Sequence, residues 1–160
     1  MKRILVLISL VGFSLSAHAQ LEVTVHPDQK TLLESSDPIL RANKKLVYDF
    51  WVKVFQGQDA SLIPEMLTEE YLQHNPNVPS GRAAFTKFVT SLPPLKEGKL
   101  TTIRDLVMIT AERDIVTLAF RNERKHPTKE GVTYTTTWFD MFRIENGKIA
   151  EHWDSARLWQ

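Results

Sequence analysis

The order of two hydrophobic periodicities constrains the fold of this chain more than any other feature. Between Asp37 and Leu92 the apolar residues recur at spacings of three and four, the period of helices that bury one face. After Lys99 the pattern is that of strands separated by turn residues. Helices followed by antiparallel strands predict an α+β domain, with the helices packed on one side of a curved sheet.

Three helices are expected in the first half of the domain. The first begins at Asp37-Pro38, where an N-cap oxygen precedes a proline at the first helical position, and ends at Gly57. A shorter helix follows Asp59 and includes Leu67, after which residues 71–76 are expected to leave the helix as a bent loop. The third helix begins after Gly81. Strands are expected at residues 101–111, 115–124, 132–144 and 148–158.

The first 19 residues have the pattern of a secretory signal peptide. Lys2 and Arg3 precede an apolar run, and Ala17-His18-Ala19 provides a small-residue cleavage site. The run is well short of the roughly 20 residues that a membrane-spanning helix needs. We therefore expect cleavage near Ala19, a periplasmic or secreted protein with no membrane association in its mature form, a surface lead-in at residues 20–36, and the domain at residues 37–160.

Charge and cysteine content exclude several classes of function. Loss of Lys2 and Arg3 lowers the basic residues from 20 to 18 against 19 acidic residues, so the mature net charge is about −1. Nucleic acids and anionic membranes are bound through clustered excess lysine and arginine, so neither is an expected partner. The absence of cysteine excludes disulfides, thiolate chemistry and cysteine metal ligands.

The turn at residues 145–148 of the last hairpin admits two registers. A two-residue Asn-Gly turn pairs Glu145 with Lys148 and places Asp140 beside Trp153. A three-residue turn, with Gly147 in the left-handed conformation, pairs Ile144 with Lys148 instead. A one-residue slip moves side chains to the opposite face of the sheet, so the two registers predict different sites.

We favour the three-residue turn because it sorts the polar residues coherently. It pairs Asp140 with His152 and Trp138 with Asp154 on one face, beside Phe142. On the other face it leaves Arg143 diagonal to Glu151. Two carboxylates and an imidazole on an aromatic face are costly to bury without a purpose or a partner. They form either a structural network or a titratable cluster at the floor of a pocket.

Two motifs carry a resemblance to a known family. The first is Gln73-His74-Asn75-Pro76, followed by Gly81-Arg82, Phe85 and Phe88, and the second is the closing hairpin at residues 139–154. In their order and separation they resemble the SnoaL-like branch of the nuclear-transport-factor-2-like (NTF2-like) superfamily.

The resemblance covers residues 38–157 and implies a fold, a site and a partner. The fold is a cone, in which a curved and mainly antiparallel sheet wraps around helices and encloses an apolar cavity. Named members are polyketide cyclases, which close a ring by intramolecular aldol condensation without a cofactor. Members commonly dimerise through the outer faces of their sheets, which would suit exposed Phe139, Met141 and Trp153. A covering helix or the lead-in segment is the alternative for those three residues.

The resemblance also implies roles for individual residues. Asp140 or Asp154 would be the acid/base, and His74 and His152 would donate hydrogen bonds to carbonyl oxygens. Gln73 and Asn75 would orient His74 or the substrate. The pocket for a small hydrophobic molecule would be lined by Trp138, Phe142, Phe85, Phe88, Tyr48 and Trp51.

Three hypotheses follow for the function. The first is a cofactor-independent cyclase, lyase or isomerase acting on a hydrophobic carbonyl compound. The second is a non-catalytic periplasmic binder of a small hydrophobic ligand. The third is a metal site formed by His74, His152 and Asp154, although the resemblance implies neither metal nor cofactor.

Overall fold

The computed structural model describes residues 21–93 and 100–158. The signal peptide expected at residues 1–19 lies outside this range, so cleavage and export stay predictions. No helix among the described residues is long and apolar enough to cross a membrane.

The first helix begins and ends where the sequence predicts. Helix α1 (Pro38–Asp49) starts after Asp37, whose side chain accepts hydrogen bonds from the backbone N–H groups of Ile39 and Leu40. It continues as the π-helix η2 (Phe50–Phe55), where Gln56 N donates to Trp51 O over a five-residue step at 2.8 Å. The chain leaves this helix at Gly57, where a Cβ atom would collide with the carbonyl oxygens of Lys53 and Val52.

The second helix is shorter than expected, and a strand follows it directly. A 3₁₀ turn η3 (Ala60–Leu62) leads into α2 (Ile63–Met66), and strand β1 (Leu67–Gln73) follows. The assignment of Leu67 to the helix and of residues 71–73 to a loop was therefore wrong. Strand β1 forms because it pairs in parallel with the last strand of the chain, a contact that local sequence does not reveal. Helix α3 (Arg82–Ser91) begins after Gly81, as expected.

Strand β1 and the four later strands form a five-stranded sheet with the order β1-β5-β4-β3-β2. Strands β2 (Leu106–Glu112), β3 (Ile115–Lys125), β4 (Thr133–Glu145) and β5 (Lys148–Asp154) are antiparallel to their neighbours in this series. The expected α+β class with a mainly antiparallel sheet is confirmed. The first of these strands begins five residues later than predicted and the last ends four residues earlier.

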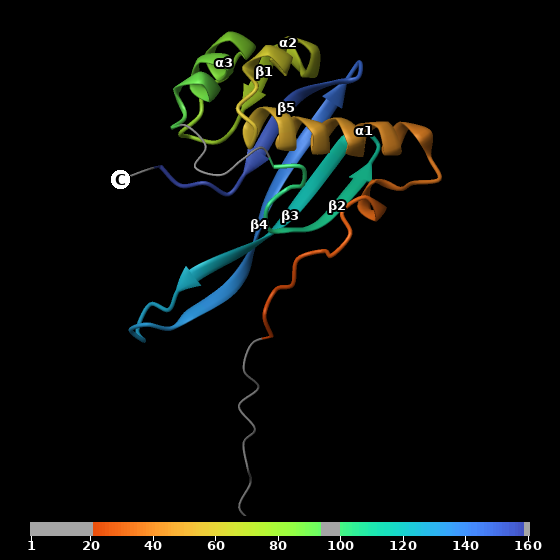
Figure 1. The fold of residues 1–160 in the computed structure, drawn as a ribbon. Helices are drawn as coiled ribbons and strands as arrows, with labels where there is room; N and C mark the ends of the chain where they lie inside the picture. Colours follow the sequence, from red (N-terminus) through yellow and green to blue (C-terminus); the bar gives the residue numbers. More distant parts are fainter. Residues whose placement is uncertain (1–20, 94–99, 159–160) are drawn as a thin grey trace, which may run out of the picture.

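The core lies between the helices and one face of the sheet. Helix α1 crosses that face, α2 and α3 lie at the β1 end, and the far halves of β3 and β4 project away from the helices (Figure 1). Buried residues of the helices, including Val47 and Phe85, pack with Leu118, Phe142 and Ile149 of the sheet. The cavity described below opens within this layer.

The segment before α1 is held more firmly than a loose lead-in would be. Gln29 Oε1 accepts hydrogen bonds from Tyr48 Oη and Ile103 N, and Gln29 Nε2 donates to Ile103 O. The backbone N–H of Val23 donates to Thr135 Oγ1 on β4. These bonds attach residues 21–36 to the sheet and to α1.

The final hairpin has the two-residue turn, so the predicted three-residue register was wrong. Asn146 and Gly147 have φ angles of 51° and 73°, and Glu145 pairs with Lys148. Both central residues of this turn type need positive φ, which asparagine and glycine tolerate best. Our prediction gave more weight to the sorting of the polar residues than to turn propensity. In the structure, turn propensity decides the geometry of the hairpin.

A bulge nevertheless puts the polar residues on the predicted face. Ile144 pairs with Ile149 but Arg143 pairs with Glu151, so Ala150 has no partner. The extra residue shifts the register, as a β-bulge does. Asp140 therefore pairs with Asp154 rather than with the predicted His152, and Phe142 pairs with His152 rather than with the predicted Ala150. The observed pairing is shifted by two residues from the predicted one, and a shift of two returns each side chain to the same face of the sheet. Asp140, His152 and Asp154 therefore still share one face.

Gly147→Ala should lower the free energy of unfolding by about 1 kcal/mol, because a left-handed backbone costs an L-residue roughly this much. A Cβ atom there would meet nothing within 4 Å, so the cost comes from the backbone alone. Urea denaturation measures it. Gly147→Asn is the matched control and should lose less, because asparagine visits this conformation readily. Equal stability of the alanine variant and the unaltered protein would contradict the assigned turn.

Candidate functional site

A small cavity lies between the π-helix, α3 and the β1-β5-β4 part of the sheet. Its volume is about 50 Å³, well below the roughly 300 Å³ at which drug-sized ligand pockets begin. It has an aromatic wall and a polar wall. The lining residues are Phe50, Trp51, Phe55, Tyr71, Gln73, Asn75, Phe85, Asp140, Phe142, His152 and Asp154.

The polar wall is built around a chain of hydrogen bonds through His152. His152 Nε2 lies 2.9 Å from Asp140 Oδ1, and His152 Nδ1 lies 2.7 Å from Gln73 Oε1. The backbone N–H of Asn75 also donates to Gln73 Oε1 at 3.0 Å, which identifies that atom as the amide oxygen. An amide oxygen only accepts, so His152 Nδ1 must carry a hydrogen. The proton on the other side of the ring is then shared between Nε2 and Asp140.

Asp140 occupies an environment that resists its ionisation. The residue is 3% exposed, and desolvation by burial raises the pKa of its carboxyl group above the usual value. Hydrogen bonds from His152 and from Trp138 Nε1, which donates to Oδ2 at 3.1 Å, act against this rise. The neighbouring Asp154 adds a smaller push upward to the pKa of Asp140. Asp140 and His152 therefore form a buried pair with one exchangeable proton between them.

Asp154 faces Asp140 across the β4–β5 ladder and is held by different donors. Its Oδ2 accepts from Asn75 Nδ2 at 2.6 Å, and its Oδ1 accepts from Ala156 N at 2.8 Å. Asn77 N donates to Asn75 Oδ1, which fixes the orientation of the Asn75 amide. Asn75 thus positions Asp154 at the rim of the cavity, while Gln73 positions His152 deeper inside.

His74 lies on the other face of the sheet, away from the cavity. Its Nε2 lies 2.8 Å from Glu151 Oε1, and its ring stacks on Trp153 with centroids 5.3 Å apart and planes 3° from parallel. Glu151 also accepts from Arg143 Nε at 2.9 Å, directly across the strand pair rather than diagonally as predicted. The bond to His74, followed by the bond to Arg143, lowers the pKa of Glu151.

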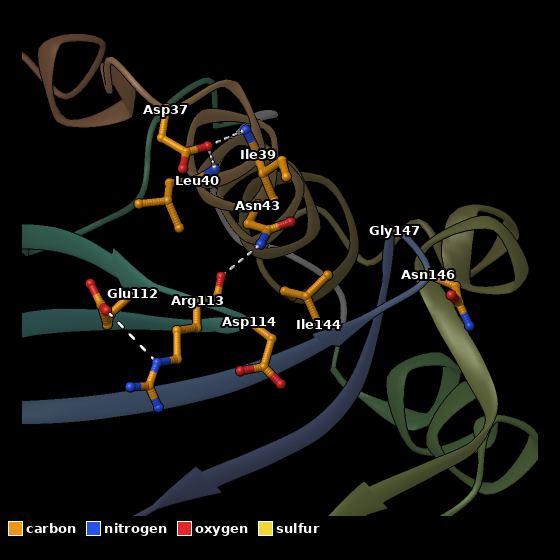
Figure 2. A pocket seen from close by; sticks show the side chains of 10 residues that line it. All are labelled: Asp37, Ile39, Leu40, Asn43, Glu112, Arg113, Asp114, Ile144, Asn146 and Gly147. Carbon is orange, nitrogen blue, oxygen red and sulfur yellow. Dashed lines mark hydrogen bonds and ion pairs between the residues drawn. The ribbon is translucent and has the colours of Figure 1, made fainter.

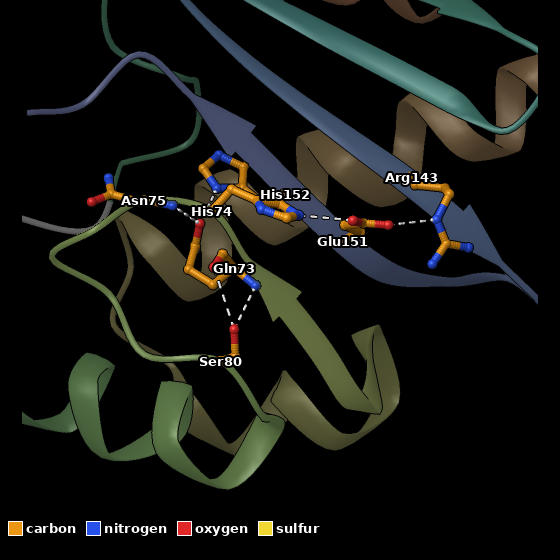
Figure 3. Close-up of polar contacts among 7 residues, drawn as sticks. All are labelled: Gln73, His74, Asn75, Ser80, Arg143, Glu151 and His152. Atoms are coloured by element: carbon orange, nitrogen blue, oxygen red, sulfur yellow. Dashed lines mark hydrogen bonds and ion pairs between the residues drawn. The ribbon is translucent and has the colours of Figure 1, made fainter.

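The alternation of side chains along β1 and its extension explains this separation. Figure 3 shows Gln73 directed to His152, and His74 directed to Glu151 and Arg143. His74 N donates to His152 O, so the chain stays extended beside β5 past the end of β1. Neighbouring residues of an extended strand point to opposite faces, and His74 therefore leaves the site that Gln73 enters.

The structure changes the ligand set expected for a metal. With His74 on the outer face, the expected set of His74, His152 and Asp154 is not brought together. Among the described residues, ligand atoms of Asp140, His152 and Asp154 do lie within 4.8 Å of one another. Both nitrogens of His152 are engaged by Gln73 and Asp140, so a cation would have to break at least one of these bonds.

Of the six aromatic residues expected to line the pocket, three do so and three do not. Trp51, Phe85 and Phe142 line the cavity, and Phe142 packs on the ring of His152 with centroids 4.7 Å apart. The other three expected lining residues lie outside it. Trp138 donates a hydrogen bond to Asp140, Phe88 packs on Phe85, and the hydroxyl of Tyr48 donates to Gln29.

Three lining residues escaped the sequence analysis as site residues: Phe50, Phe55 and Tyr71. Phe50 and Phe55 belong to the helical apolar periodicity of the first helix, which predicts burial but no site. Tyr71 lies two positions before Gln73, so recognition of β1 as a strand would have placed both on the cavity face.

The outer face of the sheet keeps exposed apolar side chains. Phe139 and Met141 are 52% and 36% exposed, so neither a described helix nor the lead-in covers them fully. The expected dimer contact across this face stays a prediction.

A larger hollow on the surface is lined by groups with structural roles. It has a volume of about 560 Å³ and lies between the start of α1 and the β2–β3 and β4–β5 turns (Figure 2). Asp37 caps α1 there, and Asn43 Nδ2 donates to Arg113 O at 3.4 Å. No chemistry comparable to the Asp140–His152 pair is present among its lining residues, so the smaller cavity is the candidate site.

Comparison with known proteins supports the resemblance seen in the sequence. The model of the SnoaL-like domain matches residues 49–152, more than half of the chain. The chain belongs to the SnoaL-like domain family. The matched region includes every residue that lines the cavity except Asp154. The expected relationship to the SnoaL-like branch of the NTF2-like fold is confirmed.

Solved structures support the fold of this SnoaL-like protein. A candidate polyketide cyclase from Acidithiobacillus ferrooxidans is 14% identical and covers 76% of this chain and 89% of its own, with a TM-score of 0.52. A candidate SnoaL-like polyketide cyclase from Jannaschia sp. CCS1 is 15% identical and covers 74% of this chain and 88% of its own, with a TM-score of 0.50. No curated protein matches the sequence. At these identities the likeness establishes the fold alone.

In the unaltered protein, Asp140 should make the free energy of unfolding fall as pH rises. The Asp140→Asn variant should lack this fall. Because burial raises the pKa of Asp140 in the folded state, its contribution to stability is complete below an unfolded pKa of about 3.9 and is lost as pH rises through the folded value. Asparagine can still donate to His152 and accept from Trp138, so the variant should fold. Its stability relative to the unaltered protein should therefore increase from pH 4 to pH 8.

Urea denaturation at a series of pH values measures this difference. Asp114→Asn, at an exposed position on the β2–β3 side of the sheet, is the control for loss of one carboxylate. A stability difference between the Asp140 variant and the unaltered protein that stays constant over the whole pH range would contradict the raised pKa.

Proposed function

We propose that this cavity catalyses cofactor-independent proton transfer next to a carbonyl group, in an aldol-type cyclisation, a lyase reaction or an isomerisation. The single observation that carries the proposal is the buried Asp140–His152 pair, whose proton is confined to one hydrogen bond of 2.9 Å. A group with a pKa raised toward neutral pH can both take and return a proton, which is what such a reaction requires.

Asp140 is the residue we assign as the acid/base. Each carboxylate oxygen has two lone pairs, so Oδ1 and Oδ2 can accept a substrate proton while keeping their bonds to His152 and Trp138. His152 shares the transferred proton and is oriented by Gln73. Asp154 is bonded to Asn75 and Ala156 and lies nearer the rim, so we assign it to positioning.

The proton moves in a closed cycle. Asp140 removes a proton from the carbon beside the substrate carbonyl, and the electron pair of that C–H bond becomes the double bond of an enolate. In a cyclase the enolate carbon then attacks a second carbonyl carbon, and the new alkoxide takes the proton back. In an isomerase the proton returns to a different carbon. Neither sequence of steps consumes an oxidant or a second substrate.

The aromatic wall gives the reaction a dry environment. The rings of Phe50 and Trp51 both pack on Phe142, with centroids 6.0 and 6.3 Å from that of Phe142. Exclusion of water strengthens the electrostatic interactions of Asp140 with a substrate. The same wall would also hold a ligand that undergoes no reaction, and a non-catalytic binder is the alternative outcome of the test below.

The test is deuterium incorporation at the carbon beside a carbonyl, followed by proton NMR in D₂O. With a panel of small ketones and 1,3-diketones, the protein should accelerate exchange above the buffer rate. Asp140→Asn should lower this rate by about 10²- to 10³-fold, the scale of a lost general base. Asp114→Asn should leave it unchanged.

Two results would overturn the assignment. Binding of the panel compounds without exchange would make the protein a binder rather than an enzyme. Full exchange by the Asp140 variant would remove Asp140 as the acid/base.

A further inference from the structure

The hydroxyl of Tyr71 is a buried donor whose hydrogen has no use within the protein. Tyr71 lies on β1, lines the cavity and is 1% exposed. Its Oη lies 3.1 Å from Gln73 Nε2. The Gln73 amide is oriented by the backbone N–H of Asn75, which donates to its oxygen, so Nε2 is the donor and Tyr71 Oη the acceptor of that bond.

The direction of this bond leaves the phenolic hydrogen without an acceptor. A tyrosine hydroxyl has one hydrogen to donate, and the bond from Gln73 uses only a lone pair of its oxygen. Tyr71 has no other hydrogen-bond partner among the described residues. A buried donor left unpaired costs free energy, so the position favours an acceptor supplied from inside the cavity.

We propose that Tyr71 Oη donates a hydrogen bond to the carbonyl oxygen of the substrate, and that this substrate is a small neutral carbonyl compound of few heavy atoms. The inference rests on the proposed function and adds the class of substrate and the group that recognises it. A cavity of about 50 Å³ limits the buried part of such a compound to a few heavy atoms. Neutrality follows from the two carboxylates, Asp140 and Asp154, that face the same space and would repel an anion.

Tyr71 would stabilise the negative charge that develops on the substrate oxygen during the reaction. When Asp140 takes the proton, the negative charge leaves the carboxylate and appears on the substrate oxygen as an enolate. A hydrogen bond from Tyr71 to that oxygen becomes stronger as the charge develops. Burial, followed by the two carboxylates, raises the pKa of Tyr71, so the phenol keeps its hydrogen and acts as a donor rather than a base.

The test compares two ligands of the same shape, one with an acceptor oxygen and one without. Cyclopentanone has a carbonyl oxygen where methylenecyclopentane has a CH₂ group. Dissociation constants from NMR titration should be lower for cyclopentanone with the unaltered protein. Tyr71→Phe should weaken cyclopentanone binding by about 10-fold, the scale of one hydrogen bond to a buried acceptor. It should leave methylenecyclopentane binding unchanged, which also shows that the cavity of the variant is intact.

Cyclododecanone tests the size of the substrate, because the same carbonyl is then carried by a ring too large for the cavity. It should bind far more weakly than cyclopentanone. Equal affinity of the two ketones would overturn the assignment of a small substrate. Equal losses for cyclopentanone and methylenecyclopentane in Tyr71→Phe, or no binding of either by the unaltered protein, would overturn the role of Tyr71.

The exchange measurement separates this inference from the function on which it rests. Asp140→Asn should bind cyclopentanone but fail to exchange its α-hydrogens. If the unaltered protein shows the Tyr71-dependent preference for cyclopentanone without exchange, the recognition stands and the proposed catalysis fails. If exchange occurs but Tyr71→Phe alters neither binding nor rate, the catalysis stands and the role of Tyr71 fails.

Discussion

The hydrogen bond between Asp140 and His152 is the interaction on which the character of this cavity depends. Both residues are buried, so neither could remain there without a partner of matching hydrogen-bonding capacity. Gln73 completes the chain by accepting from the opposite nitrogen of His152, and Asn75 fixes the direction of the Gln73 amide. The parallel pairing of β1 with β5 brings these residues together, because it sets Gln73 directly beside His152.

The arrangement couples structure to chemistry through the direction of each hydrogen bond. Gln73 accepts with its oxygen and donates with its nitrogen, so one side chain determines both the ring hydrogen of His152 and the free hydrogen of Tyr71. The cavity therefore offers a proton acceptor at Asp140 and a donor at Tyr71. Proton removal beside a carbonyl needs both. The π-helix contributes Phe50, Trp51 and Phe55 to the aromatic wall, and such helices are rare and often occur at functional sites.

Local sequence signals predicted the parts of the fold that local physics determines. The N-cap Asp37 and Gly57 mark the limits of the first helix, and the order of helices and strands predicts the α+β class. Strand β1 could not be found in this way, because it is an edge strand whose pairing with β5 joins residues far apart in the chain. The misplacement of His74 follows from that omission, since only a strand sends Gln73 and His74 to opposite faces. The predicted hairpin register was wrong because the turn propensity of Asn146-Gly147 decides the turn, and the bulge at Ala150, which has no local signature, restored the shared face of Asp140, His152 and Asp154.

The protonation of His152 is the most direct test of the account. Nitrogen-15 NMR of the protein with labelled histidine, assigned with a His152→Gln variant, reports which ring nitrogen carries hydrogen. At neutral pH the account predicts a protonated Nδ1, bonded to Gln73, with Nε2 sharing a hydrogen with Asp140. A ring with a bare Nδ1 and a hydrogen only on Nε2 would contradict the direction of the hydrogen bonds through Gln73, on which the assignments of His152 and Tyr71 depend.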